Sequence, residues 1–291
     1  MAHEINRLPH IERRNPETHK GTFGRVSIIG GSLGMAGAVM LAGEAALRSG
    51  AGLVDCTVPE RIADIVSSSA AHSLLINVLD SAEDGTFSEY AARNVLDAVS
   101  SSTVLAAGPG MGTSAGSRAV TKKVVSKAEI PLILDADGLN CCAAEGTEAL
   151  KSRTGNTILT PHPGEMSRLT DKPVHEIQNK RLETAVRFAS EYSSVVVLKG
   201  HRTVVTDGEN YYINRTGNPG MAAGGSGDVL TGVIAGILAS ADLSPFEAAC
   251  AGVWVHGTAG DLGAERRGEI SLAPEDTLNF ISGAFQKYPA C

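Results

Sequence analysis

The chain has 291 residues, of which 43% are hydrophobic and 4% aromatic, and its formal net charge is −7. This length permits one large domain or two small ones, with enough apolar residues for a sizeable core. The acidic balance, without any long run of like charges, argues against a nucleic-acid partner, because binding to phosphate backbones requires clustered Lys and Arg. No apolar run approaches the roughly 18 residues that a membrane-spanning helix requires.

The cysteines indicate a reducing compartment. Cys56, Cys141, Cys142, Cys250 and Cys291 contain no C-x-x-C spacing, their number is odd, and two of them are adjacent in sequence. The N-terminus also lacks the apolar segment of a signal peptide. We therefore expect a cytoplasmic protein with free thiols.

Short β-branched runs alternate with helical patterns from Arg25 onward. Strands are predicted at residues 26–29, 53–58, 103–107, 132–135, 157–160 and 195–199. Helices are predicted at residues 36–49, 88–99, 115–128 and 174–192. Several of the strands are continuously apolar, as in a mostly parallel sheet that is buried on both faces. The alternation predicts a three-layer α/β fold with helices flanking the sheet, in one domain over residues 1–291.

The pattern changes after Lys199. Two short strands at residues 203–206 and 211–214 flank Asp207-Gly208, which predicts a hairpin. Two amphipathic helices follow, at residues 228–239 and 245–262. Residues 1–20 are expected to form an N-terminal extension.

The most informative segment is residues 214–229, NRTGNPGMAAGGSGDV. Its glycines permit a backbone that turns N–H groups inward, and the following helix adds its own free N–H groups and the positive end of its dipole. Together these features favour a bound phosphate. Asp228 stands at the expected helix start, where it could also serve only as the N-cap residue. The dipole is expected to keep Asp228 ionised.

Three further segments follow predicted strands, at the edge of the sheet where α/β folds bind ligands. Lys199-Gly200 ends one strand, although this lysine could also be a surface residue of the hairpin. The loop TPHPGE presents His162 and Glu165, which could also be a hydrogen-bonded loop residue and a first-turn carboxylate. The loop DADG contains Asp135 and Asp137, which could hold Mg²⁺ through water or simply form a turn. Residues 30–37 form a possible substrate-contacting turn.

One segment favours a different fold. Gly110-x-Gly112-x-x-Ala115 lies between a predicted strand and helix, and Asp135 follows about twenty residues later, which resembles a Rossmann dinucleotide fingerprint. The motif follows the third predicted strand rather than the first, and Gly108-Pro109 already forms the turn. The Walker A pattern is absent from the sequence, which argues against a P-loop NTPase.

Taken together, the segments resemble a known family. The succession KGTFGRVSIIGGS, GMAGA, AALRSGAG, AAGPGMG, LILDADGLN, ILTPHPGEM, VVVLKGHRTVV and NRTGNPGMAAGGSGDVLTG is similar to the ADP/ATP-dependent NAD(P)H-hydrate dehydratases. The resemblance covers residues 20 to about 260, and GNPGMAAGGSGD with TPHPGE is its most specific part. It implies a ribokinase-like fold and a hydro-lyase that repairs the S form of hydrated NADH or NADPH.

The resemblance also implies roles for individual residues. The family phosphorylates the ring hydroxyl from ADP or ATP with Mg²⁺ and then eliminates phosphate, so Asp228 is implied as the general base that meets the hydroxyl. Glu165 is implied as a metal ligand through water. The nucleotide would be bound by Lys199, Gly200, His201, Arg202, Thr203, Asn218, Gly224, Gly225 and Gly227. The hydrated dinucleotide would be bound by Ala42, Gly110, Gly112, His162 and Asp228, with Ala38 one helical turn from Ala42.

Partners and alternatives follow from the same resemblance. Similar proteins are often homotetramers, and a chain with only about twenty residues before the matching region is expected to rely on a separate epimerase chain. Stand-alone dehydratases resemble the ADP-using branch. A small-molecule kinase of the same fold, acting on a thiazole or pyrimidine alcohol, would share the phosphate site and the aspartate. A non-catalytic nucleotide sensor is the more distant alternative, in which Asp228 would be dispensable.

Overall fold

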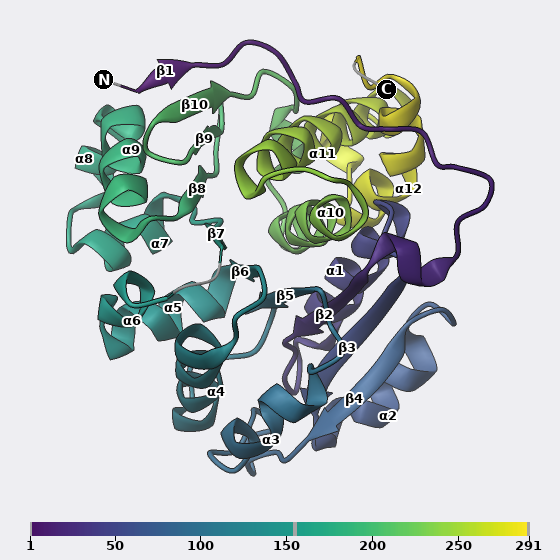
Figure 1. Cartoon of the computed structure of the whole chain (residues 1–291), viewed down its shortest axis with the longest axis vertical. Helices are drawn as coiled ribbons and strands as arrows, with labels where there is room; N and C mark the ends of the chain where they lie inside the picture. The colour runs from purple at the N-terminus through teal and green to yellow at the C-terminus, as the bar shows by residue number, and fades with distance from the viewer. Residues whose placement is uncertain (1, 154–155, 290–291) are drawn as a thin grey trace.

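The computed structural model describes residues 2–153 and 156–289. Within these residues, ten strands form one sheet in the order β1-β10-β9-β8-β7-β6-β5-β2-β3-β4 (Figure 1). The strands are β1 His3–Glu4, β2 Arg25–Ile29, β3 Leu53–Pro59, β4 Leu75–Leu79, β5 Val104–Ala107, β6 Leu132–Leu134, β7 Thr157–Leu159, β8 Val195–Leu198, β9 Val204–Thr206 and β10 Asn210–Ile213. In this order, all neighbouring strands from β8 to β4 pair in parallel, whereas β9 is antiparallel to both of its neighbours. The predicted mostly parallel sheet and the hairpin are confirmed.

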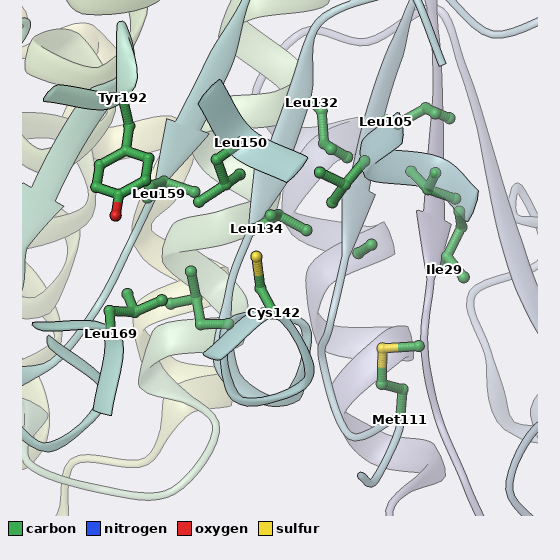
Figure 2. Packing of buried hydrophobic residues seen from close by; sticks show 14 of the residues in the cluster. Ile29, Leu105, Met111, Leu132, Leu134, Cys142, Leu150, Leu159, Leu169 and Tyr192 are labelled. Carbon is green, nitrogen blue, oxygen red and sulfur yellow. The ribbon is translucent and has the colours of Figure 1, made fainter. Parts of the chain in front are cut away.

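Helices cover both faces of the sheet because the central strands are apolar on both faces. In β5, Leu105 and Ala107 join one core cluster, whereas Val104 and Ala106 join the other. Figure 2 shows part of the first cluster, where Leu105, Leu134 and Leu159 from neighbouring strands lie among side chains of the covering helices. This face is covered by α3 Ala91–Ala98, α4 Ala115–Lys127, α5 Ala136–Glu145, α6 Glu148–Lys151, α7 Pro163–Thr170, α8 Val174–Asn179 and α9 Arg181–Tyr192.

The second face carries the helices that shape the site. It is covered by α1 Ala36–Arg48, α2 Glu60–Ser69, α10 Ser226–Ser240 and α11 Pro245–Arg267, with α12 Pro274–Gln286 packed outside them (Figure 1). Helices α1 and α10 approach closely because Gly232 has no side chain: a Cβ atom there would lie 2.0 Å from the Ala42 carbonyl oxygen. The three-layer arrangement predicted from the sequence is therefore confirmed.

Several local predictions need correction. The helix predicted at residues 174–192 is two helices, α8 and α9, because Lys180 between them has a non-helical backbone, with φ −131° and ψ 41°. The segment after β6, expected to be a loop, is the helix α5. Strand β4 and helices α2, α6 and α12 were not predicted. The N-terminal segment adds β1 to the edge of the sheet beside β10.

Two further observations concern the environment of the chain. In the described residues, Cys56, Cys141, Cys142 and Cys250 are buried free thiols, and Cys291 lies outside those residues. No helix in the part of the chain that the structure describes is both long and apolar enough to cross a membrane. The described part of the chain also contains the short 3₁₀ helices η1 Lys20–Phe23, η2 Pro219–Met221 and η3 Glu269–Ser271.

Candidate active site

The order of strand connection reverses beside β2, and loops gather at that point. From β2 the chain continues to β3 and β4 on one side, then returns to β5 on the other side and continues through β6, β7 and β8. Ligands of open α/β sheets bind beyond the carboxyl ends of the strands at such a switch point. Here the Gly31 N–H donates to the Pro109 carbonyl at 2.7 Å, and the Ser32 hydroxyl donates to the Gly110 carbonyl at 2.8 Å. These bonds tie the loops after β2 and β5 together across the switch point.

Asp135, directly after β6, is the centre of a buried polar network. The residue is 1% exposed. Its Oδ1 accepts hydrogen bonds from the Lys199 ammonium at 2.6 Å and the Thr160 hydroxyl at 2.8 Å, and its Oδ2 accepts one from the Thr231 hydroxyl at 2.8 Å. Lys199 directly follows β8, Thr160 directly follows β7, and Thr231 lies in α10. A buried charge is tolerated only when it is paired and hydrogen-bonded, so this one carboxylate fixes three elements relative to one another.

Helix α10 begins before Asp228. Its first residue is Ser226, and Gly225 takes the N-cap position with φ +98°, in the left-handed region that a glycine adopts without strain. Asp228 is the third helical residue, so the interpretation of Asp228 as the N-cap is wrong. Within the described residues no side chain caps this helix end. The Ser226 N–H donates to the Ala223 carbonyl at 3.3 Å, so the next N–H groups, those of Gly227 and Asp228, are the ones that can meet an anion.

The Lys199 ammonium lies against this first turn. A Cβ atom on Gly227 would be 3.2 Å from Lys199 Nζ and 3.7 Å from Asp135 Oδ2. A Cβ atom on Gly224 would meet no atom within 4 Å. The structure thus brings the Lys199 side chain to the glycine-rich start of α10, beside Gly227, one residue before Asp228.

Asp228 is an unpaired carboxylate among other charges. Among the described residues, none donates a hydrogen bond to its carboxylate or forms an ion pair with it. Burial raises the pKa of Asp228 to about 7, and the negative charges of Asp135, Asp137 and Glu165 act in the same direction, against Lys199. The expectation that the helix dipole keeps this group fully ionised is therefore wrong. A carboxylate with a pKa near neutrality is well suited to act as a general base.

His162 and Glu165 form a reciprocal cap at the start of α7. His162 Nδ1 accepts hydrogen bonds from the backbone N–H groups of Gly164 and Glu165, while Glu165 Oε2 accepts one from the His162 N–H at 2.7 Å. Because Nδ1 acts as an acceptor, the ring proton resides on Nε2, which lies 3.3 Å from Glu165 Oε1. Burial, with the positive charges of Lys199 and Arg168, lowers the pKa of His162. His162 is thus a neutral side chain, half exposed, that can donate from Nε2.

The turn after β8 is a short backbone loop. Gly200 has φ +139° and Arg202 has φ +55°, and the Thr203 hydroxyl bonds to both the N–H and the carbonyl of Gly200. The side chains of His201 and Arg202 are exposed on this turn. Arg181 at the start of α9 donates hydrogen bonds to the carbonyls of Leu198 and Lys199. These bonds fix the main chain at the beginning of the turn.

The glycine-rich segment rests on α11. Asp261 accepts hydrogen bonds from the Gly217 N–H and the Asn218 side-chain amide, both at 2.9 Å. His256 Nε2 lies 3.4 Å from the Ser226 hydroxyl, and burial lowers the pKa of His256 to about 4. Sequence reasoning missed Arg181, Asp261 and His256. For the two residues of α11, the signal was a pair of polar side chains in the middle of the helix, where most residues between positions 248 and 263 are small or apolar.

The residues expected to contact the dinucleotide do not all lie at one place in the structure. Gly110 and Gly112 lie in the loop at the switch point with φ +61° and φ +69°, and the Gly112 N–H donates to Asp137 at 2.9 Å. Ala42 is fully buried against α10, whereas Ala38 is partly exposed and lies beside Gly110. The structure therefore brings the two glycines and Ala38 together at the switch point. His162 instead follows β7, within the electrostatic reach of Lys199 and Asp135, and the Ala42 side chain is buried. The assignment of Ala42 stays a prediction.

The carboxylates of the site are better suited to a magnesium ion bound mainly by the phosphates of a nucleotide than to one bound directly by the protein. Both oxygens of Asp135, Asp137 and Glu165 already have partners within the chain. In the residues described, no group of three or more His, Cys, Asp or Glu side chains is arranged to hold a metal ion. Mg²⁺ usually keeps several waters and binds through one or two carboxylates plus substrate phosphates, so these side chains fit a contact to the ion through water, and the assignment of Glu165 stays a prediction.

The fold places the chain in the ribokinase-like class. A solved ribokinase-like superfamily protein from Enterococcus faecalis superposes with a TM-score of 0.82 at 26% identity, covering 97% of this chain and 93% of that one. The family model described as NAD(P)H-hydrate dehydratase matches residues 26–282. The chain therefore belongs to the NAD(P)H-hydrate dehydratase family, and the Rossmann alternative is set aside.

Individual relatives agree with the family. The chain is 42% identical to the bifunctional NAD(P)H-hydrate repair enzyme Nnr of Moorella thermoacetica over 93% of its own length and 51% of the relative's, so it spans about half of that protein. It is 35% identical to the ADP-dependent (S)-NAD(P)H-hydrate dehydratase of Neisseria meningitidis, with 92% and 87% covered. The ADP/ATP-dependent NAD(P)H-hydrate dehydratase of Bacillus subtilis, co-crystallised with ATP and Mg²⁺, superposes with a TM-score of 0.80 at 30% identity, with 96% and 95% covered.

The raised pKa of Asp228 predicts how its removal changes stability with pH. Its folded pKa of about 7 exceeds the ordinary value near 4, so the folded protein holds this proton between pH 4 and 7 while the unfolded chain releases it. Wild-type stability therefore falls as the pH rises through this window. Asp228→Asn should be more stable than the wild type by about 1–3 kcal/mol at pH 8, less than the full ~1.4 kcal/mol per pKa unit because the side chain is partly exposed.

Urea denaturation at pH 4.5 and pH 8 measures this difference. The advantage of Asp228→Asn should be present at pH 8 and nearly absent at pH 4.5. A variant that is equally destabilised at both values would mean that Asp228 has a structural role and an ordinary pKa.

The space above Gly227 gives a second prediction. Gly227→Ala places a methyl group 3.2 Å from Lys199 Nζ, within the volume assigned to the phosphate. The affinity for ADP, measured by calorimetry, should fall at least about tenfold, as expected when a charged hydrogen bond is lost. Gly224→Ala, where the methyl meets open space, is the control for stability and should leave the melting temperature unchanged. Unchanged ADP affinity in Gly227→Ala would place the phosphate elsewhere.

Proposed function

We propose that this chain catalyses the ADP-dependent dehydration of the S form of hydrated NADH or NADPH, releasing NAD(P)H, phosphate and AMP. The observation that carries the proposal is the unpaired Asp228 carboxylate, whose pKa is raised to about 7, at the open N-terminus of α10. The names of the relatives from Neisseria meningitidis and Bacillus subtilis support the choice of substrate and nucleotide.

In the first step, Asp228 takes the proton of the ring hydroxyl. The hydroxyl oxygen forms a bond to the terminal phosphorus of ADP, and the bond between that phosphorus and the bridging oxygen breaks, which releases AMP. The N–H groups at the start of α10 and the Lys199 ammonium lie where negative charge develops on the transferred group. Bound Mg²⁺ would supply further positive charge to the phosphates, with Glu165 holding it through water.

In the second step, the ring loses phosphate. The lone pair of the ring nitrogen assists cleavage of the carbon–oxygen bond, whose electrons leave with the phosphate. A proton is then lost from the neighbouring ring carbon, and in the overall balance it appears on the released phosphate. Hydroxide is a poor leaving group and phosphate a good one, which is the chemical reason for the nucleotide. The same N–H groups and ammonium stabilise the departing phosphate.

We further propose where and in what form the protein works. The buried free thiols support a reducing, cytoplasmic location. Leu75 and Val78 on the edge strand β4, with Ile65 on α2, are exposed apolar side chains that support a homo-oligomer, a tetramer by resemblance to similar proteins. The bifunctional name of the Moorella relative supports a link to an epimerase of the same hydrates, carried in our proposal by a separate chain.

The direct test is turnover of hydrated NADH with ADP and Mg²⁺. The near-ultraviolet absorbance of the reduced ring should return, with one phosphate and one AMP formed for each ring restored. Asp228→Asn should lower this turnover at least about 10²-fold, the low end for loss of a positioned base, because its amide cannot take the hydroxyl proton. Its folding is checked by the denaturation experiment above.

Two outcomes would contradict the proposal. A stable phosphorylated alcohol formed from a thiazole or pyrimidine substrate, with the hydrate untouched, would indicate a kinase of the same fold. Normal turnover in Asp228→Asn would remove the catalytic role of this residue.

A further inference from the structure

We propose that Asp135 is a positioning residue that holds the Lys199 ammonium at the N-terminus of α10. There the ammonium binds the terminal phosphate of the nucleotide, which allows the protein to distinguish ADP from AMP. The inference deepens the proposed function and rests on its phosphate site. It assigns Lys199 to the end of the nucleotide that reacts, and it gives Asp135, Thr160 and Thr231 a common purpose.

The Lys199 ammonium is held in one position by its neighbours. Lys199 Nζ lies 2.6 Å from Asp135 Oδ1 and 3.8 Å from Glu165 Oε2, and the lysine side chain is only 17% exposed. Arg181 holds the Lys199 carbonyl at 3.2 Å, which fixes the main chain from which the side chain extends. The aliphatic stem and the charged head are therefore both held in place.

The site gathers several carboxylates. Asp135, Asp137 and Glu165 lie close enough to Asp228 for their negative charges to raise its pKa. A phosphate would be repelled from four carboxylates unless a fixed cation faced it. Burial acts to lower the pKa of Lys199, but the charges of Asp135 and Glu165 outweigh it and raise that pKa, so the lysine stays charged. Lys199 is the cation that the site itself supplies.

The Lys199 ammonium also lies close to Asp228, the residue that takes the hydroxyl proton in the proposed reaction. The ammonium lies 3.2 Å from the place of a Gly227 Cβ atom, one residue before Asp228. The group that is transferred must lie between the nucleotide and the hydroxyl whose proton Asp228 accepts. An ammonium at this point meets the transferred phosphate and not the adenosine. AMP lacks that phosphate, so the contact should separate ADP from AMP.

Both oxygens of the Asp135 carboxylate already have partners inside the network. Lys199, Thr160 and Thr231 together occupy both of its oxygens, and it is almost fully buried. The two hydroxyl donors fix the carboxylate, and the carboxylate fixes the ammonium. Removing either hydroxyl should therefore loosen Lys199 without changing any charge.

The experiment measures the binding of ADP with Mg²⁺ and of AMP by calorimetry, on the full chain. The variants are Asp135→Asn, Lys199→Met, Thr231→Val and the double variant Asp135→Asn/Lys199→Met. The preference of the wild type for ADP over AMP should fall at least about tenfold in the three variants that lose a charge, since a charge-assisted hydrogen bond is lost. In Thr231→Val it should fall less, by about threefold, the effect of weakening one neutral hydrogen bond.

The matched control is Asp55→Asn. Asp55 is also 1% exposed and is paired with Arg25 at 2.5 Å, but it lies within β3, away from the glycine-rich segment. Asp55→Asn should keep the preference for ADP even if the protein becomes less stable. The double variant removes both charges and so avoids a buried unpaired ammonium, which keeps the test informative if Asp135→Asn fails to fold.

The outcomes separate this inference from the proposed function. Loss of the ADP preference in the charge variants supports the inference, whether or not the wild type dehydrates the hydrate. An unchanged preference in Lys199→Met and in the double variant overturns it, even if the wild type is an active dehydratase. An equal loss of preference in Asp55→Asn would also overturn it, because the effect would then follow from general destabilisation.

Discussion

The site depends on one buried ion pair, between Asp135 and Lys199. Its two residues follow different strands, and the hydroxyls of Thr160 and Thr231 complete the carboxylate's hydrogen bonds. Because charges without partners are very costly in a protein interior, this network fixes β6, β7, β8 and the start of α10 relative to each other. The free N–H groups of α10 and the charged lysine then face the same small space, which suits a phosphate group.

Asp135 also contributes to the raised pKa of Asp228, whereas Lys199 acts against it. Its carboxylate lies close enough to Asp135, Asp137 and Glu165 to feel their charge, yet no described residue pairs with it. Burial and these neighbours raise its pKa to about 7, where a base is both available and strong enough to take a hydroxyl proton. Asp135 is thus an acceptor for Lys199 and also part of the reason that Asp228 holds its proton more tightly.

The sequence predicted most of what local patterns determine. Continuous β-branched runs predicted the central strands, and clustered glycines predicted the tight turn around Gly225 at the start of an apolar helix, where we propose that phosphate binds. It could not predict contacts between distant residues: Asp135 is 64 positions from Lys199 and 96 from Thr231. Helix α5 was missed because its Asp-Gly start is typical of a turn, although Gly138 there allows close packing on β5. The dipole expectation for Asp228 was wrong because burial of the carboxylate, together with the neighbouring negative charges, raises its pKa.

The most direct test of this account is a crystal structure with Mg²⁺ and an ADP analogue whose bridging oxygen is replaced by a methylene group. The account predicts an oxygen of the terminal phosphate at about 3 Å from Lys199 Nζ and from the first N–H groups of α10, with the Asp135 contact retained. A terminal phosphate bound elsewhere, with Lys199 in contact only with Asp135 and Glu165, would contradict it.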